Sequence, residues 1–160
     1  MEVFHRKKTL LLFKMGSGSS KYEGPPEIQD KYYPGFVEGL PNLAGKNFAI
    51  TGCTSGTGYE TALAAARKGA KVFMLNRVSA RSEAAEKAIK LAVPNADIRT
   101  VACDLTSLAS TREASAVLVK ELKDTGLDVL CCNAGVMANK DEATGDGYDI
   151  QMQVTNVKDV

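Results

Sequence analysis

A cluster of glycines between Thr51 and Gly58 is the segment best suited to bind a ligand. It reads Thr-Gly-Cys-Thr-Ser-Gly-Thr-Gly and stands between a short apolar run and an alanine-rich segment, as a turn between a strand and a helix would. Glycines let the backbone approach a ligand, and the free N–H groups of a helix N-terminus attract phosphate. A tight turn without a ligand is the alternative, but strand, turn and helix in this order favour a pyrophosphate site. The expected contacts are Thr51, Gly52, Ser55, Gly56, Thr57 and Gly58.

Asn76 and Arg77 follow the next apolar run and bear on which dinucleotide would bind. Folds that take NAD place a carboxylate against the ribose roughly 20 residues after the first glycines. The stretch 61–82 contains no Asp or Glu. A carboxylate would repel a 2′-phosphate, whereas the guanidinium of Arg77 can bind one at two points, with Ser55 as a further hydroxyl contact. The sequence therefore favours NADP over NAD, with Asn76 and Arg77 as contacts, and Arg81 is interpreted as a solvated helix residue.

A parallel sheet would bring these residues together, and the sequence after Gly45 has the pattern of one. Apolar runs of four to six residues alternate with helical patterns, which is typical of repeated βα units. Strands are expected at 46–51, 71–75, 98–102 and 127–132, and helices at 59–68, 79–92 and 107–123. This order predicts an α/β fold, a doubly wound parallel sheet with the nucleotide at the carboxyl ends of its strands.

Three later segments add to this pattern, and the first two stand at the ends of expected strands. Asp104 and Leu105 follow the third strand, Asn133-Ala134-Gly135 follows the fourth, and Asp146-Gly147-Tyr148 leads to Asn156. With the Thr-Gly-x-x-x-Gly-x-Gly turn, these segments in this order resemble the short-chain dehydrogenase/reductase family. The retinol-dehydrogenase and protochlorophyllide-reductase members are the most similar type.

The resemblance spans 45–156 and implies a fold, a cofactor and a reaction. The fold would be a Rossmann-type sheet of strand order 3-2-1-4. Asp104 and Leu105 would contact the adenine, and Asn133, Ala134 and Gly135 would complete the cofactor site. The reaction would be hydride transfer between a nicotinamide and a small carbonyl or alcohol, or less favourably a double bond. Thr57 departs from the isoleucine usual in the family, which is tolerable where only the backbone N–H is used.

The family's catalytic set is represented here by Asn156 alone. The family uses a tyrosine as general acid or base, a lysine four residues later and an upstream serine. None of the five tyrosines has a lysine four residues on. Asn156 matches the asparagine that positions a water and the lysine, but the next residues, Val-Lys-Asp-Val, do not follow the family pattern. We therefore expect the sequence to leave that pattern after Asn156, as a splice variant, a gene-model error or a fragment would.

Length and composition fit one domain preceded by a leader. The chain has 160 residues, 44% hydrophobic residues and a net charge of +1. Residues 1–42 are rich in glycine and proline without periodicity and are expected to be a flexible leader, whereas 43–160 should form the NAD(P)-binding domain. The balanced charge gives no compositional case for a nucleic-acid partner.

The first residues and the cysteines bear on location and metals. The longest apolar run near the start covers only 10–13, far below the roughly 20 residues of a membrane span. We expect a cytoplasmic protein without a membrane segment, and basic residues before that run leave organelle targeting as a weaker alternative. The four cysteines lack Cys-x-x-Cys spacing, so buried free thiols are expected and no metal site is predicted.

The sequence thus supports three functional hypotheses. By family resemblance the protein is an NADP-dependent oxidoreductase, although this chain, without the tyrosine and lysine pair, is expected to be inactive alone. A non-catalytic nucleotide-binding or dominant-negative partner is the second, and a fragment without independent function is the third. The fourth strand should be an exposed apolar edge, open to pairing with another chain.

Overall fold

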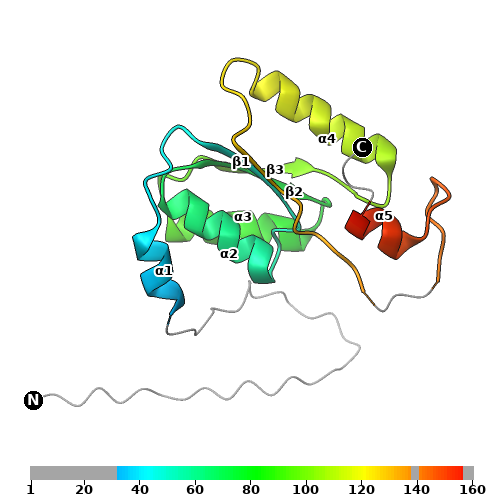
Figure 1. The fold of residues 1–160 in the computed structure, drawn as a ribbon, viewed down its shortest axis with the longest axis horizontal. Helices are drawn as coiled ribbons and strands as arrows, with labels where there is room; N and C mark the ends of the chain where they lie inside the picture. The colour runs from blue at the N-terminus through cyan, green and yellow to red at the C-terminus, as the bar shows by residue number, and fades with distance from the viewer. Residues whose placement is uncertain (1–31, 138–140, 157–160) are drawn as a thin grey trace, which may run out of the picture.

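The computed structural model describes residues 32–137 and 141–156. One sheet of parallel strands has helices on both faces (Figure 1). The strands are β1 (Asn47–Thr51), β2 (Lys71–Asn76), β3 (Ile98–Ala102) and β4 (Val129–Cys131). The helices are α1 (Tyr33–Gly39), α2 (Gly56–Arg67), α3 (Ala80–Ala92), α4 (Leu108–Glu121) and α5 (Ile150–Asn156).

The strand order is β3-β2-β1-β4, which confirms the predicted doubly wound sheet. The chain runs outward from β1 through β2 to β3 and then returns to pair β4 with β1. The order therefore reverses between β1 and β4, and all strands end at the same edge. In folds of this kind ligands bind at that edge, beside the point of reversal.

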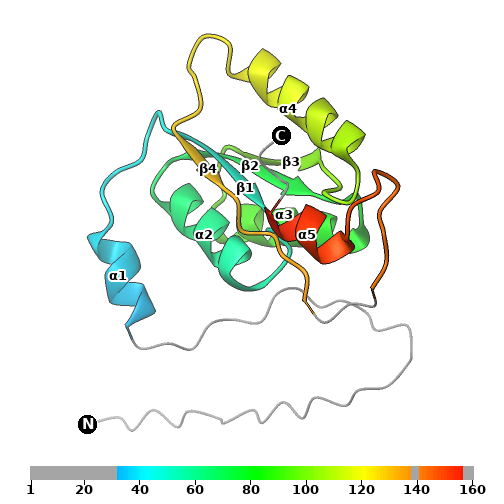
Figure 2. The same ribbon diagram turned by 45° about the vertical axis from the view of Figure 1, so that its right-hand side comes forward.

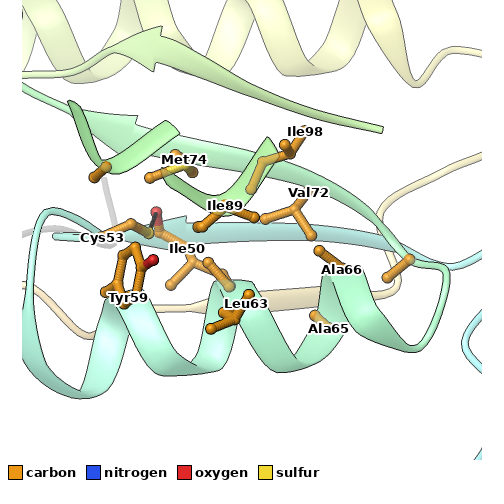
Figure 3. Close-up of a cluster of buried hydrophobic side chains, with 13 residues drawn as sticks. Ile50, Cys53, Tyr59, Leu63, Ala65, Ala66, Val72, Met74, Ile89 and Ile98 are labelled. Atoms are coloured by element: carbon orange, nitrogen blue, oxygen red, sulfur yellow. Dashed lines mark hydrogen bonds between the residues drawn. The ribbon is translucent and has the colours of Figure 1, made fainter. Parts of the chain in front are cut away.

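Two apolar clusters, one on each face, hold the helices to the sheet. Ile50, Val72 and Met74 pack with residues of α2 and α3 on one face, as Figure 3 shows. Ala49, Phe73 and Val101 pack with α4 and α5 on the other. Central strands covered on both faces read as continuous apolar runs, which is why the runs in β1 and β2 were informative in the sequence.

Local signals place the helix ends close to their predicted positions. Ser79 and Ser107 cap α3 and α4 by accepting hydrogen bonds from Ser82 N and Ser110 N. The expected helix 59–68 begins earlier, at Gly56, because the last two glycines of the turn belong to its first turn. The fourth strand is shorter than predicted, and only Val129–Cys131 pairs with β1.

α1 lies inside the segment predicted to be a flexible leader, and its helical structure differs from that prediction. Tyr33 Oη donates to Glu60 O at 3.0 Å, and Lys68 Nζ donates to Glu38 O at 2.8 Å. Val37 is buried, and the two hydrogen bonds attach the short helix to α2, beside which it lies (Figure 2). Only one of its seven residues has a buried apolar side chain, and a single such residue cannot show helical periodicity in the sequence. Residues 1–31 of the expected leader lie outside the described part of the chain.

The two edges of the sheet differ in how they are protected. At β3, Glu86 accepts a hydrogen bond from Thr100 N at 2.7 Å, which occupies a backbone donor of that edge. At β4, Val129 and Leu130 are 37% and 54% exposed. The apolar exposed edge predicted for the fourth strand is present, while its pairing with another chain stays a prediction.

No helix within the described residues is long and apolar enough to cross a bilayer.

The amino ends of β1 and β4 are joined by polar contacts far from the ligand edge. Asp128 accepts hydrogen bonds from Lys46 Nζ and Asn47 N, both at 2.8 Å. The Lys46 hydrogen bond, with that from Asn47 N, lowers the pKa of the Asp128 carboxyl. The Asn47 amide donates to Thr125 Oγ1 and Gly126 O, which fixes the turn before β4. Asp128 thus has a structural role at the start of β4.

Replacement of Asp128 by asparagine should make the stability of the protein less dependent on pH. A carboxyl whose pKa is lowered by folding stabilises the fold above its unfolded pKa, about 3.9, and this contribution is lost as the pH falls through the folded pKa. Urea denaturation from pH 7 to pH 2 should show wild type and Asp128→Asn converging below about pH 4. Asp97→Asn, which removes an exposed 3.7 Å ion pair with Lys71, is the control and should change stability less. A constant difference between wild type and Asp128→Asn over this range would contradict the prediction.

Candidate nucleotide-binding site

A cleft of about 590 Å³ lies at the carboxyl ends of the strands. Segments from after all four strands line it, which is the arrangement predicted from the sequence. The expected site residues on its wall are Gly52, Ser55, Asn76, Arg77, Asp104, Leu105, Asn133, Ala134 and Gly135. Residues that the sequence analysis did not assign to the site also line it: Thr54, Leu75, Ser79, Arg81, Cys103, Thr106, Val136, Ile150 and Val154.

The glycine-rich turn brings the start of α2 to this cleft. Gly52 and Gly56 have φ of +71° and +60°, which residues with a side chain rarely adopt. A Cβ at Gly56 would meet nothing within 4 Å, so the backbone there borders open space. Ser55 precedes the helix and makes no side-chain capping bond, and the first N–H groups of a helix have no partner within it. The turn therefore has the features that a phosphate group requires.

Asn133, which follows β4, holds this turn in place. Its Nδ2 donates to Thr51 O at 3.0 Å and to Gly52 O at 3.2 Å. Ala134 N donates to Thr51 Oγ1 at 2.9 Å. A Cβ at Gly58 would stand 2.4 Å from both Asn133 Nδ2 and Gly52 O, which is not possible without movement of the turn. Gly58 is therefore needed for packing, whereas Gly56 is needed for its conformation.

Asn76 lines the cleft, and its side chain has a structural role that the sequence did not predict. Its Oδ1 accepts from Cys53 N at 2.8 Å, and its Nδ2 donates to Ser82 Oγ at 3.1 Å. The side chain is 3% exposed, so its polar atoms are committed to the protein. The amide links the end of β2 to the glycine-rich turn and to α3. The contact of Asn76 with the cofactor stays a prediction.

Arg77 and Arg81 supply the positive charge of the cleft. Both are exposed and both line it. Arg77 directly follows β2, where the sequence analysis placed the recognition of a 2′-phosphate. Arg81 is exposed as expected of a helix residue, but its position on the wall of the cleft was not predicted. Because Arg81 is the second residue of α3 and lines the same cleft, its charge adds to that of Arg77.

The loop after β3 is fixed by Asp104. The carboxylate Oδ1 accepts from Thr106 N and Thr106 Oγ1, at 3.0 and 2.8 Å. Asp104 N donates to Ser110 Oγ in the first turn of α4. The side chain of Leu105 is buried in the apolar cluster beneath the loop. These contacts fix the conformation of the loop that lines this side of the cleft.

The cysteines near the cleft are free thiols held in largely apolar surroundings. Burial, with a smaller contribution from Cys131, raises the pKa of the Cys53 thiol, and its Sγ donates to Ile50 O at 3.0 Å. Burial and the neighbouring Asp104 also raise the pKa of Cys103. A raised pKa leaves little of the reactive thiolate, so neither thiol is suited to be a nucleophile. Within residues 32–137 and 141–156, the structure contains no cluster of three or more His, Cys, Asp or Glu side chains that could hold a metal ion.

Asn156 is the last residue of α5, whose earlier residues Ile150 and Val154 line the cleft. The helix therefore brings the family's asparagine position toward the ligand edge of the sheet. The side chain of Asn156 lies outside the described residues. Its predicted catalytic role stays a prediction.

The fold and the cleft define a doubly wound α/β domain of the dinucleotide-binding type. The sequence pattern of the short chain dehydrogenase family matches residues 46–158. The chain belongs to this family, whose members are oxidoreductases that bind NAD(P).

Two relatives illustrate the similarity. A short-chain dehydrogenase/reductase of Aspergillus calidoustus is 40% identical over 120 residues, which are 75% of this chain and 38% of that protein. Human retinol dehydrogenase 13 is 32% identical over 130 residues, 81% of this chain and 39% of that protein. The similarity to a retinol dehydrogenase agrees with the member type expected from the sequence. The chain spans about two fifths of the length of either relative.

Solved structures give the same assignment of fold. An uncharacterised protein from Mycobacterium paratuberculosis matches with a TM-score of 0.64 and 32% identity, over 76% of this chain and 41% of that one. L-sorbose reductase from Gluconobacter frateurii, solved in complex with NADPH and L-sorbose, matches with a TM-score of 0.54 and 27% identity. That match covers 71% of this chain and 41% of the reductase.

Replacement of Gly58 by alanine should destabilise the protein, because the new methyl group overlaps Asn133 Nδ2 and Gly52 O. Overpacking of this kind costs about 1–3 kcal/mol in the free energy of unfolding, measured by urea denaturation. Gly35→Ala in α1 is the control, since a Cβ there meets nothing within 4 Å. It should leave stability unchanged or raise it by up to about 1 kcal/mol. Equal effects of the two substitutions would show that the turn is not constrained as described.

Proposed function

We propose that this chain is the nucleotide-binding part of an NADP-dependent short-chain oxidoreductase that acts on a small carbonyl or alcohol. One observation carries the proposal: Ser55, the N-cap residue of α2, and the exposed Arg77 border the same cleft. The first fits a diphosphate and the second fits an additional phosphate on the ribose. Family membership supplies the oxidoreductase class.

The residues around the cleft divide into parts that suit the parts of NADP. The backbone N–H groups of Gly56, Thr57 and Gly58 would receive the diphosphate, and Thr51 and Gly52 shape the turn that carries them. Asp104 and Leu105 would border the adenine, as the family resemblance implies. Asn133, Ala134 and Gly135 would border the cofactor from β4. When bound, NADP(H) supplies or accepts the hydride that the reaction transfers.

The charges around the cleft favour NADP over NAD. Asp104 is the one carboxylate among the described residues that line it, and Thr106 already occupies one of its oxygens. It follows β3, whereas Arg77 follows β2, where NAD-binding folds place an acidic residue. An arginine in that place attracts a 2′-phosphate by charge and by paired hydrogen bonds. The complex of the similar L-sorbose reductase with NADPH supports the same choice.

We further propose that these 160 residues bind the nucleotide without completing the reaction. The chain contains no tyrosine followed four residues later by a lysine, the pair that the family resemblance implies for proton transfer. The residues that border the cleft hold and orient a nucleotide, and Asn156 is the single position of the implied catalytic set. Nucleotide binding without turnover is the behaviour that this arrangement supports.

The cytoplasmic location stays a prediction.

Replacement of Arg77 by glutamate should weaken NADPH binding by about tenfold to a hundredfold, because a charged hydrogen bond is lost and a repulsive carboxylate replaces it. NADH binding should change much less, since NADH has no 2′-phosphate. Fluorescence titration of the full chain with each nucleotide measures both affinities. Lys87→Glu on the exposed side of α3 changes the net charge equally without lining the cleft.

The control separates a local effect from a general effect of charge. Lys87→Glu should leave both affinities close to those of the wild type. If Arg77→Glu weakens NADPH and NADH equally, the assignment of Arg77 to the 2′-phosphate is wrong. If the folded wild type binds neither nucleotide, the proposed function itself is wrong.

A further inference from the structure

Gln153 in α5 is fully buried, which is unusual for a glutamine. Its Nε2 donates to Leu105 O at 3.2 Å and to Asp146 Oδ2 at 2.8 Å. Its Oε1 accepts a hydrogen bond from Thr144 Oγ1. All the polar atoms of the side chain are therefore used, and the partners come from two separate segments of the chain.

Asp146 extends these contacts to a third element. The oxygen that accepts from Gln153 also accepts from Leu108 N, at 2.8 Å, in the first turn of α4. The Leu108 hydrogen bond, followed by that from Gln153, lowers the pKa of the Asp146 carboxyl. Asp146 and Gln153 thus connect α5, the start of α4 and the loop between β3 and α4.

These contacts converge on one wall of the cleft. Leu105 follows Asp104, and both line the cleft on the side that the family resemblance assigns to the adenine. The hydrogen bond from Gln153 holds the carbonyl of Leu105, which fixes the plane of the peptide that follows it. Val154, the next residue of α5, is buried against the same cluster as Leu105 and also lines the cleft. A shift of Gln153 would therefore move the loop and α5 together.

Asn47 shows what a purely structural buried amide does in this fold. It is 5% exposed, and its Nδ2 also makes two donations, to Thr125 Oγ1 and Gly126 O. Those contacts lie at the amino ends of the strands, away from the cleft. The two amides are similar in burial and in number of donations, but only Gln153 donates to a residue that lines the cleft.

We propose that Gln153 is a positioning residue for the adenine end of the nucleotide site, acting through the Leu105 carbonyl and Asp146. This inference rests on the proposed function, because it assigns the cleft to a dinucleotide. It predicts that loss of the Gln153 amide weakens adenine-containing ligands selectively. It also predicts that the loop 104–108 becomes less ordered in the protein without ligand.

The test compares two variants of the full chain that each replace a buried amide with an apolar side chain of similar size. Gln153→Met should weaken 2′,5′-ADP by about tenfold, the effect expected for one well-formed hydrogen bond, and leave nicotinamide mononucleotide nearly unchanged. Asn47→Leu should destabilise the fold without altering the affinity for either ligand. Calorimetric titration gives the affinities, and thermal unfolding shows that each variant is folded. Thr144→Val, which removes only the donor to Gln153 Oε1, is a milder variant expected to act in the same direction.

Hydrogen exchange in the unliganded protein provides the second measurement. Amide hydrogens of 104–108 should exchange faster in Gln153→Met than in the wild type and stay unchanged in Asn47→Leu. If the wild type binds 2′,5′-ADP but Gln153→Met binds it equally well, or exchange at 104–108 is unaffected, the proposal is wrong. If the wild type does not bind 2′,5′-ADP, the proposed function fails, and faster exchange would still support the control of this loop by Gln153.

Discussion

The close approach of Asn133 to Gly58 is the constraint on which the nucleotide site depends. Asn133 bonds to the carbonyls at the start of the turn, and the amide fits only because position 58 has no side chain. This contact places the first turn of α2 against the end of β4, at the point where the strand order reverses. The absence of a side chain at Gly58 and the amide of Asn133 therefore set the position of the helix N-terminus, and with it the attraction for phosphate.

The rest of the domain supports this arrangement from both ends of the sheet. At the amino ends, Asn47 and Asp128 join β1 to the turn before β4. At the carboxyl ends, Asn76 ties the turn to α3, and Gln153 ties α5 to the loop after β3. Asn47, Asn76 and Gln153 are buried and hydrogen-bonded, and buried polar groups with partners favour one geometry of the fold. The contacts that shape the cleft are thus made between residues of the protein itself.

The sequence predicted the parts of this structure that depend on local patterns. The apolar runs, the glycine spacing and the caps at Ser79 and Ser107 act over a few residues, so the strands and helices were placed well. The bond from Cys53 N to the amide of Asn76 was not predicted, because the two residues are 23 positions apart in the chain. Gln153, whose contact with Leu105 spans 48 residues, had no signal in the sequence. The residues of α1 contribute one buried side chain, which is too weak a pattern to predict a helix.

The central claim is that NADP binds where the glycine-rich turn, Arg77 and the loop after β3 meet. An NMR titration of the isotopically labelled chain with NADPH tests it directly, because every backbone amide reports its own surroundings. The account predicts saturable shifts at the amides of 56–58, 77 and 104–106, with Asn47 at the opposite end of the sheet unaffected. Shifts confined to other surfaces, or no shifts in a folded chain at millimolar NADPH, would contradict it.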